Sequence, residues 1–201
     1  MNYIAIDTSG ESMTIVVCKN DKILTFFDED CGVSHSVKLM EDTEKLLIKA
    51  GLKLEDADFF AVVTGAGSFT GIRIGVATVK ALCLAYKKPC LNITSFDTIA
   101  YNKEKGKVLA VIDAKHDGYY ICGYEDQKVT VPPLFVHGKD LENYSDYEFL
   151  SVKDLKEISA KGVSVADGLI KAIDKKKGLS TYSYDTVTPL YVRKSQAEEN
   201  A

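Results

Sequence analysis

The chain has 201 residues, of which 46% are hydrophobic, so it can bury a core as one large domain or two small ones. With 25 Lys and Arg residues against 29 Asp and Glu residues, the formal net charge is -4. This charge provides no global attraction for a phosphate backbone, which argues against tight RNA binding by the chain alone. No window approaches the roughly 18 consecutive apolar residues of a membrane span, and no secretory signal opens the sequence, so we expect neither membrane insertion nor export.

Cysteine and histidine usage indicates a reduced compartment and no metal site. The cysteines are odd in number, widely spaced and mostly set among apolar residues, which is typical of reduced thiols in a cytoplasm: Cys18, Cys31, Cys83, Cys90 and Cys122. No Cys-x-x-Cys pair occurs, and no two of the three histidines lie four residues apart. The sequence therefore predicts a cytoplasmic protein with neither a metal nor a bound cofactor.

The first 50 residues are predicted to form a strand meander and a helix. Alternating and buried-type apolar runs, joined by turn residues, predict three antiparallel strands at residues 2–7, 13–18 and 22–27. A helix is predicted from His35 to Ala50, because Ser34 can cap its start and Gly51 can follow its end.

The next 50 residues are predicted to alternate strands and helices. A strand at residues 59–64 leads into a glycine-rich turn, and a helix at residues 72–86 ends before Pro89. A further strand and a short helix follow at residues 90–94 and 96–101. The Lys-rich stretch at residues 102–107 is predicted to be a hinge between two domains, residues 1–101 and 102–201.

The second domain repeats the start of the first at a gapless offset of 106 positions. Ile112 and Asp113 align with Ile6 and Asp7, and Ile121 aligns with Ile15. Any two strand-turn-strand segments can align this well, so chance similarity stays open beside duplication. Beyond Val131 the similarity fades, and only a helix at residues 169–173 and an extended segment at residues 188–193 are predicted.

The glycine-rich turn carries a resemblance to a known family. Residues 65–75, GAGSFTGIRIG, closely resemble the GPGSFTGLRIG signature of the TsaB/YeaZ family. His35-Ser36, Ser95-Phe96 and residues 189–193 also match the landmarks of that family in order. Ala66 replaces the usual proline, which removes a stiff turn residue but no chemical group.

The resemblance implies a fold, an activity and partners. The implied fold is α/β, a duplicated actin-like ATPase (ASKHA, RNase H-like) fold with a reduced second half. TsaB-type proteins are non-catalytic paralogues of the TsaD enzymes that make threonylcarbamoyladenosine on tRNA. The resemblance therefore implies a scaffold that binds a TsaD-type protein and, through the complex, a TsaE-type ATPase. It also implies a homodimer when the partner is absent, and only indirect contact with tRNA.

Two features of the sequence fit a loss of catalysis. TsaD-type chains carry a His-x-x-x-His metal motif where this chain has Ser95 and Ile99, whose side chains cannot replace two imidazoles. Nucleotide binding in this fold also uses glycine-rich hairpins. The first hairpin, residues 7–10, matches this pattern in part, but the second, residues 113–118, carries bulky residues where close approach is needed.

The possible ligand-cleft residues are therefore Asp7, Thr8, Ser9, Gly10, Arg73 and Asp113. Asp7 can face a ligand or cap its own turn, and the two alternatives are equally open. Arg73 can hold an anion or be a solvated helix charge. An active phosphotransferase, with Asp7 or Asp113 positioning Mg-ATP, and a peptidase are the alternative functions.

Neither of these alternatives is favoured by the glycine-rich turn itself. The turn lacks the Lys-Ser/Thr ending of a phosphate loop and the Gly-x-Ser-x-Gly spacing of a hydrolase elbow. A tight strand-to-helix turn is the favoured interpretation, with Ser68 as the helix N-cap.

The two long helices are the predicted partner surface, and the same surface is predicted to pair two copies of the chain when the partner is absent. Apolar residues cover more of the first helix than one sheet-facing stripe requires. Small residues on the second helix would let a neighbouring helix approach closely. The predicted interface residues are Val37, Leu39, Met40, Leu46, Leu47, Gly71, Gly75 and Thr78. The alternative is that both helices bury these residues within their own domain.

Overall fold

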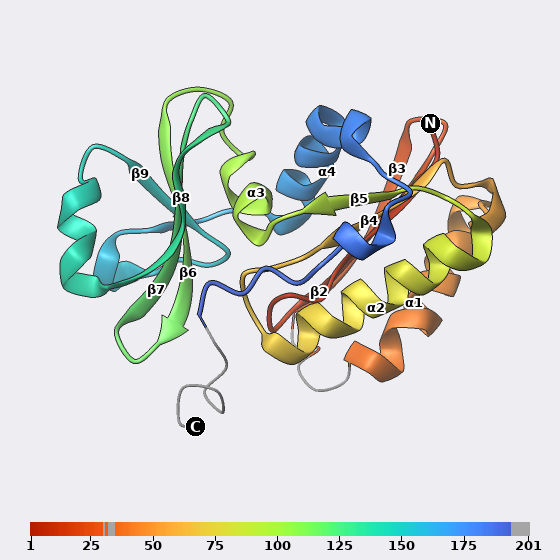
Figure 1. Ribbon diagram of the computed structural model, residues 1–201, viewed down its shortest axis with the longest axis horizontal. Helices are drawn as coiled ribbons and strands as arrows, with labels where there is room; N and C mark the ends of the chain where they lie inside the picture. The colour runs from red at the N-terminus through yellow and green to blue at the C-terminus, as the bar shows by residue number, and fades with distance from the viewer. Residues whose placement is uncertain (30, 32–34, 194–201) are drawn as a thin grey trace. The chain divides into compact units, whose positions relative to one another are not determined.

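The computed structural model describes residues 1–29, 31 and 35–193, which form two compact units (Figure 1). Unit 1 comprises Met1–Thr94 and Ile173–Leu190, and unit 2 comprises Ser95–Ala172 and the chain from Tyr191. Each unit contains one five-stranded sheet. The predicted domains, 1–101 and 102–201, stay a prediction; the compact units differ from them by grouping residues 95–101 with the second half and residues 173–190 with the first.

The sheet of unit 1 has the order β3-β2-β1-β4-β5. Its first three strands are antiparallel neighbours, and β4 and β5 are added in parallel on the other side of β1. The predicted meander and the two later strands are confirmed within one or two residues: β1 (Tyr3–Asp7), β2 (Met13–Lys19), β3 (Lys22–Asp28), β4 (Phe59–Val63) and β5 (Cys90–Ile93).

Helices α1 (His35–Ala50) and α2 (Phe69–Tyr86) share the hydrophobic core of unit 1 with β1, β2 and β4. The predicted bounds of α1 are confirmed, and α2 begins three residues earlier than predicted. Its N-cap is Ser68, whose side chain accepts a hydrogen bond from the Gly71 N–H at 3.2 Å, as predicted. By length and composition alone α2 could cross a membrane, but its buried residues belong to this core.

Residues 180–190, here called the C-terminal strap, return to unit 1 after helix α4 (Val165–Lys176). Thr181 and Cys90 exchange two backbone hydrogen bonds of 2.8 Å at the outer edge of β5. Val187 is fully buried in the core, and the Leu190 N–H donates to the Thr64 carbonyl at 2.7 Å. Residues 188–190 of the predicted extended segment are thus the end of this strap, and residues 191–193 belong to unit 2.

The sheet of unit 2 has the order β10-β9-β6-β7-β8. Its strands are β6 (Lys107–Lys115), β7 (Gly118–Glu125), β8 (Lys128–His137), β9 (Glu148–Ser151) and β10 (Lys161–Gly162). Helix α3 (Ser95–Ala100) precedes them, and short 3-10 helices connect them, including η3 (Gly138–Tyr144). The predicted helix at residues 169–173 is the central part of the longer α4.

The two sheets have the same topology, which confirms the predicted duplication. In each, an antiparallel meander lies on one side of the first strand and two parallel strands lie on the other. The gapless offset is wrong beyond the first strand. Ile15 pairs with Ile6, but Ile121 pairs with Val111 instead of Ile112, because the turn after Asp113 is one residue shorter than the turn after Asp7.

The segment predicted to be a hinge lies inside unit 2. The Asn102 side-chain amide donates to the carbonyls of Thr98 at 2.9 Å and Ser164 at 3.0 Å. Lys103 pairs with Glu148, and Lys107 pairs with Asp146 at 2.6 Å. These contacts attach the segment to the elements of its own unit.

Candidate functional site

The first hairpin, residues 7–10, follows the carboxyl end of β1. Asp7, Thr8 and Ser9 are all buried. Asp7 Oδ1 accepts hydrogen bonds from the Ser9 N–H at 2.8 Å and the Ser9 hydroxyl at 2.6 Å. Of the two alternatives for Asp7, this contact is the one in which the carboxylate caps its own turn, with Ser9 as the hydrogen-bond donor. Gly10, at the tip of the hairpin, is exposed.

The glycine-rich turn packs directly on this hairpin. The Ser68 N–H donates to the Ser9 carbonyl at 2.6 Å, and the Thr8 hydroxyl donates to the Gly71 carbonyl at 2.7 Å. A Cβ atom at Gly67 would overlap the Ser9 carbonyl oxygen, and one at Gly71 would overlap that of Thr8. The glycines therefore permit two backbones to meet, which supports the tight-turn interpretation over a phosphate loop.

The small-residue stripe of α2 faces the sheet of its own unit. A Cβ atom at Gly75 would lie 2.6 Å from Thr8 Oγ1 and 3.6 Å from Val62, and Thr78 is half-buried. The prediction that Gly71 and Gly75 meet a partner helix is wrong. The reason is that α2 must approach β1 closely to bury the Thr8 side chain beneath it.

Arg73 is exposed on the outer side of α2. Its guanidinium lies 3.8 Å from the centroid of the Phe69 ring, four residues earlier on the helix, in a cation–π contact. This contact aligns the side chain with the first turn of α2. An anion-binding role for Arg73 stays a prediction.

The second hairpin repeats the aspartate contact of the first. Asp113 Oδ1 accepts a hydrogen bond from the Lys115 N–H at 2.7 Å, and Lys115 Nζ lies 3.3 Å from Asp113 Oδ2. Lys115, His116 and Asp117 have φ values of 67°, 53° and 57°, so the turn is built from non-glycine residues in the left-handed region. Asp113 as a ligand-cleft residue stays a prediction, and so does the expectation that the bulky residues of this turn hinder the close approach of a nucleotide.

Ser95 and Ile99 lie on α3, with 5% and 0% of their surfaces exposed. Asp97, between them, is also buried and accepts a hydrogen bond from the Tyr124 hydroxyl at 3.0 Å. In residues 1–29, 31 and 35–193, no three or more His, Cys, Asp or Glu side chains gather as metal ligands would. The side chain of His35 lies outside the described part of the chain.

Helix α1 separates the predicted interface residues into two groups. Leu39, Leu46 and Leu47 are 1%, 6% and 7% exposed and belong to the core of unit 1, so their assignment to the partner surface is corrected. The reason is that this inward stripe covers the sheet. Val37 and Met40 are 76% and 45% exposed and remain available on the outer side of the helix.

Two further apolar side chains on the helices of unit 1 are exposed. Ile48 is 74% exposed and lies eleven residues after Val37, which places both on one side of α1. We call Val37, Met40 and Ile48 the α1 stripe. Leu84 on α2 is 62% exposed and was not singled out from the sequence, because it lies within the continuous apolar run 81–84.

Comparison with known proteins identifies the chain's relatives. A family model described as TsaD, tRNA N6-adenosine threonylcarbamoyltransferase, matches residues 28–135, more than half of the chain. The tRNA threonylcarbamoyladenosine biosynthesis protein TsaB of Buchnera aphidicola is 28% identical over 169 residues, covering 82% of this chain and 78% of the relative. TsaB of Escherichia coli K12 is 27% identical over 172 residues, covering 84% of this chain and 72% of the relative. The chain belongs to the TsaD family, in its TsaB/YeaZ group.

Solved structures of TsaB/YeaZ proteins share the fold. YeaZ from Pseudomonas aeruginosa superimposes with a TM-score of 0.74 at 19% identity, covering 94% of this chain and 99% of that protein. Another Pseudomonas aeruginosa protein, described as similar to peptidase YeaZ, gives a TM-score of 0.79 at 20% identity. The predicted duplicated α/β fold is confirmed, and its description as actin-like stays a prediction.

Within the TsaB/YeaZ group, the family signature has a structural explanation in this chain. Gly67 and Gly71 of the signature contact the first hairpin through their backbones, and Ser68 caps α2. The serine thus has a helix-capping contact and not the geometry of a hydrolase nucleophile elbow. The backbone contacts of the signature therefore hold the start of α2 against the hairpin that follows β1.

Proposed function

We propose that this chain is a non-catalytic subunit for tRNA threonylcarbamoyladenosine biosynthesis that binds and stabilises a TsaD-type transferase. TsaB relatives are named for this pathway, and the family model is that of the transferase itself. The observation that carries the proposal is the contrast between the first hairpin and α1. The hairpin backbone is packed against the glycine-rich turn, whereas the α1 stripe is exposed.

The absence of catalysis is supported by the chemistry of α3. Ser95 and Ile99 stand where the resemblance places the two histidines of a TsaD-type metal motif. Both side chains are buried, and an aliphatic group supplies no lone pair to a metal ion. The chain is proposed to contribute contact surface to its partner and no reacting group.

The partner surface is proposed to be the α1 stripe together with Leu84. Exposed apolar side chains aligned along one helix face are typical of helix-mediated association. We further propose that a TsaE-type ATPase joins through the complex, that tRNA is contacted only indirectly, and that the assembly acts in the cytoplasm. The net charge of -4 supports the indirect contact with tRNA.

A calorimetric titration tests the partner surface. Replacing Val37 and Ile48 together by glutamate is expected to weaken binding to the TsaD-type partner by at least about tenfold, because two desolvated anions would enter an apolar contact. The thermal unfolding temperature should not change, since both side chains are exposed. Val129→Glu on β8, where the native side chain is 55% exposed, is the matched control and should bind normally. Normal binding by the α1 variant would place the partner surface elsewhere.

Activity assays of the pure chain test the non-catalytic role. The isolated protein is expected neither to hydrolyse ATP nor to transfer threonylcarbamoyl to tRNA, while its addition should increase the activity of a TsaD-type partner. Metal-dependent turnover by the pure chain would instead support the phosphotransferase alternative. Serine-directed hydrolysis would support the peptidase.

A further inference from the structure

Two buried cysteines of unit 1 lie in contact with each other. Cys83, near the end of α2, and Cys90, the first residue of β5, are both fully buried and carry free thiols. The two thiols share a hydrogen bond, and the Cys83 thiol also donates to the Pro89 carbonyl at 3.8 Å. A disulfide has a sulfur–sulfur distance of about 2.05 Å, so two sulfurs in hydrogen-bond contact need only a small approach to form one.

The turn between α2 and β5 brings the two cysteines together. Lys87 ends α2 in the left-handed conformation, with a φ value of 52°. The Lys88 N–H then donates to the Cys83 carbonyl at 3.1 Å, which folds the chain back over the last turn of the helix. A disulfide between Cys83 and Cys90 would therefore close this turn and leave both elements in place.

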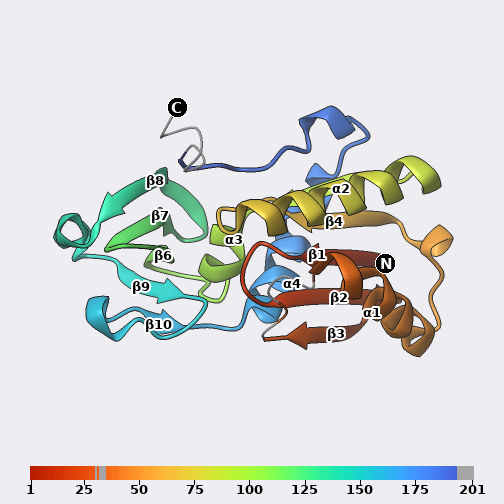
Figure 2. The same ribbon diagram turned by 90° about the horizontal axis from the view of Figure 1, so that it is seen from below.

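The C-terminal strap lies over both cysteines. Thr181 pairs with the backbone of Cys90. The Tyr184 hydroxyl donates to the carbonyls of Cys83 and Lys88. Figure 2 shows the strap in blue alongside α2. A small reagent therefore reaches the two thiols when the strap opens locally.

The hydrogen bond between the thiols makes them chemically unequal. Donation from Cys90 lowers the pKa of the Cys83 thiol. The same hydrogen bond and burial both raise the pKa of the Cys90 thiol. Because the thiolate is the nucleophile in cysteine oxidation, Cys83 is the sulfur that reacts first. Cys90 is then in contact with the oxidised sulfur and can attack it.

From this arrangement, we infer that Cys83 and Cys90 are a modification site, which a hydroperoxide oxidises to an intramolecular disulfide beneath the strap. The Cys83 thiolate attacks one peroxide oxygen and the O–O bond breaks, which gives a sulfenic acid and a hydroxide that takes up a proton. The Cys90 sulfur then attacks the Cys83 sulfur, and the sulfenic oxygen leaves as water with the Cys90 proton. Two thiols and one hydrogen peroxide thus give one disulfide and two waters.

This site is separate from the proposed partner contact. The disulfide would join α2 to β5 within unit 1, and its formation needs neither a TsaD-type protein nor the α1 stripe. The inference therefore does not depend on the proposed function.

Peptide mapping of the full chain tests the disulfide. Reduced protein is treated with hydrogen peroxide, the remaining thiols are blocked with iodoacetamide in denaturant, and the protein is digested with trypsin. Trypsin cleaves after Lys87, so the expected product is a cross-linked pair of peptides, one with Cys83 and one with Cys90. The other cysteines should stay thiols, and dithiothreitol should restore the pair.

Serine variants separate the roles of the two sulfurs. In C90S the new hydroxyl can still donate to Cys83, but no second thiol attacks the sulfenic acid, which dimedone should trap. In C83S, Cys90 should react with peroxide several-fold more slowly, because its burial disfavours the thiolate. C122S is the control, since Cys122 is a buried thiol on β7 of unit 2, and this variant should form the disulfide as the wild type does.

Tyr184→Phe tests access through the strap. Without the two hydrogen bonds of the hydroxyl, the strap should open more often, and the disulfide should form about two to ten times faster at the same peroxide concentration. Tyr182→Phe is the control, because the native side chain is 68% exposed, and it should react at the wild-type rate. Equal rates for Tyr184→Phe and the wild type would contradict access through the strap.

Two results with the wild-type chain would overturn the inference, and neither requires a variant to fold. One is that Cys83 and Cys90 both stay thiols after an exposure to peroxide that oxidises glutathione completely. The other is that Cys83 is recovered as a sulfinic acid or in a disulfide with a different cysteine. Either product would show that Cys90 does not attack the oxidised sulfur.

Discussion

At the scale of single residues, close backbone contact explains the glycine-rich turn. Gly67 and Gly71 lie against the carbonyl groups of Ser9 and Thr8, where a side chain would overlap them. Asp7 and Asp113 each accept a hydrogen bond from the N–H two residues later, so the duplicated hairpins share a local capping contact. These residues hold the hairpins in shape.

Substitution of Gly71 by alanine tests this backbone contact. The new methyl group would overlap the Thr8 carbonyl oxygen, so we expect a loss of about 1–3 kcal/mol in the free energy of unfolding, as for other overpacked sites. Gly10→Ala is the matched control, since its nearest atoms would lie 3.9 Å from the new Cβ. Urea unfolding of both variants gives the comparison. Equal losses would show that the contact with Thr8 does not limit the residue at position 71.

Restoring the two histidines tests the role of α3. Ser95→His with Ile99→His places two larger polar rings in a fully buried helix, so we expect a lower unfolding temperature and no transferase activity. Ser95→Ala with Ile99→Val adds no volume, so this variant should keep the fold, and its unfolding temperature should fall less than that of the histidine variant. The assay is tRNA modification without a TsaD-type partner. Activity near that of the complete complex would contradict the non-catalytic role.

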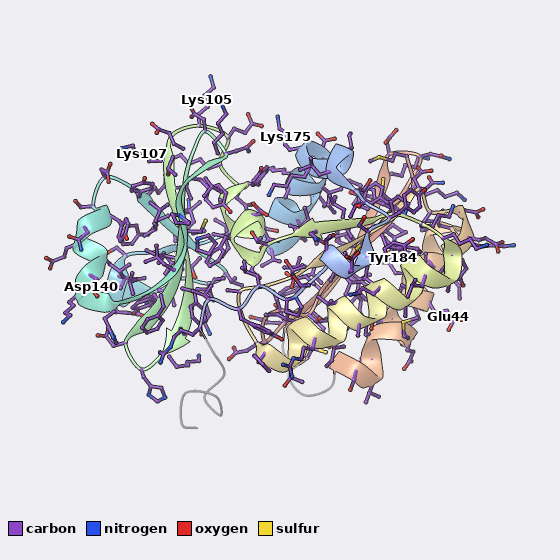
Figure 3. The ribbon with its side chains drawn as sticks, in the orientation of Figure 1. Glu44, Lys105, Lys107, Asp140, Lys175 and Tyr184 are labelled. Carbon is purple, nitrogen blue, oxygen red and sulfur yellow. The ribbon has the colours of Figure 1, made fainter. Side chains whose placement is uncertain are left out.

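At the scale of elements, the C-terminal strap completes unit 1. Tyr184, labelled in Figure 3, donates through its hydroxyl to the carbonyls of Cys83 at 3.2 Å and Lys88 at 2.8 Å. Lys80 Nζ donates to the Val187 carbonyl at 3.4 Å. The strap thereby joins the end of α2 to the turn that leads into β5.

Removal of one hydroxyl measures the contribution of the strap. Tyr184→Phe leaves the ring in place and removes the donor to two carbonyls, so we expect a loss of about 0.5–1.5 kcal/mol in unfolding free energy. Tyr182→Phe is the control on the same segment, because Tyr182 is 68% exposed. Chemical denaturation of both variants is the measurement. An unchanged midpoint for Tyr184→Phe would show that the hydrogen bonds of the Tyr184 hydroxyl do not contribute to holding the strap.

At the scale of the whole molecule, each unit buries tyrosines whose ionisation opposes folding. Burial is the main cause that raises the pKa of Tyr3 in unit 1 and of Tyr101 and Tyr119 in unit 2. For Tyr3, the nearby Cys18 and Asp174 add to the rise. In the unfolded chain a tyrosine ionises near pH 10. The unfolded state therefore loses these protons at lower pH than the folded state.

The resulting pH dependence is testable for Tyr3. Below about pH 10 the Tyr3 hydroxyl is protonated in both the folded and the unfolded state, so its contribution to the free energy of unfolding is fully present. Above that pH the unfolded state ionises first, and stability should fall as pH rises toward the folded pKa. Tyr3→Phe should reduce the slope of unfolding free energy against pH above about pH 10. A slope equal to that of the wild type would contradict the burial of an ionisable Tyr3.

Local sequence patterns were sufficient to predict the elements of the first hundred residues. The meander, α1, Ser68 as a cap and the end of α2 before Pro89 follow from alternation, capping and turn residues close together in the chain. Unit 2 was predicted only in part, because its shorter second hairpin and the register shifts of β8 interrupt the repeat.

By itself, the sequence determined the family signature, the repeated meander and the presence of serine and isoleucine at positions 95 and 99, since each depends on residue identity or short spacing. Only the tertiary structure decided which side chains of α1 face the core, that Gly71 and Gly75 face β1, and that the strap closes unit 1. The physical reason is that these outcomes depend on atoms distant in sequence. Leu190 pairs with Thr64, and Gly71 meets Thr8, through contacts that no local pattern encodes.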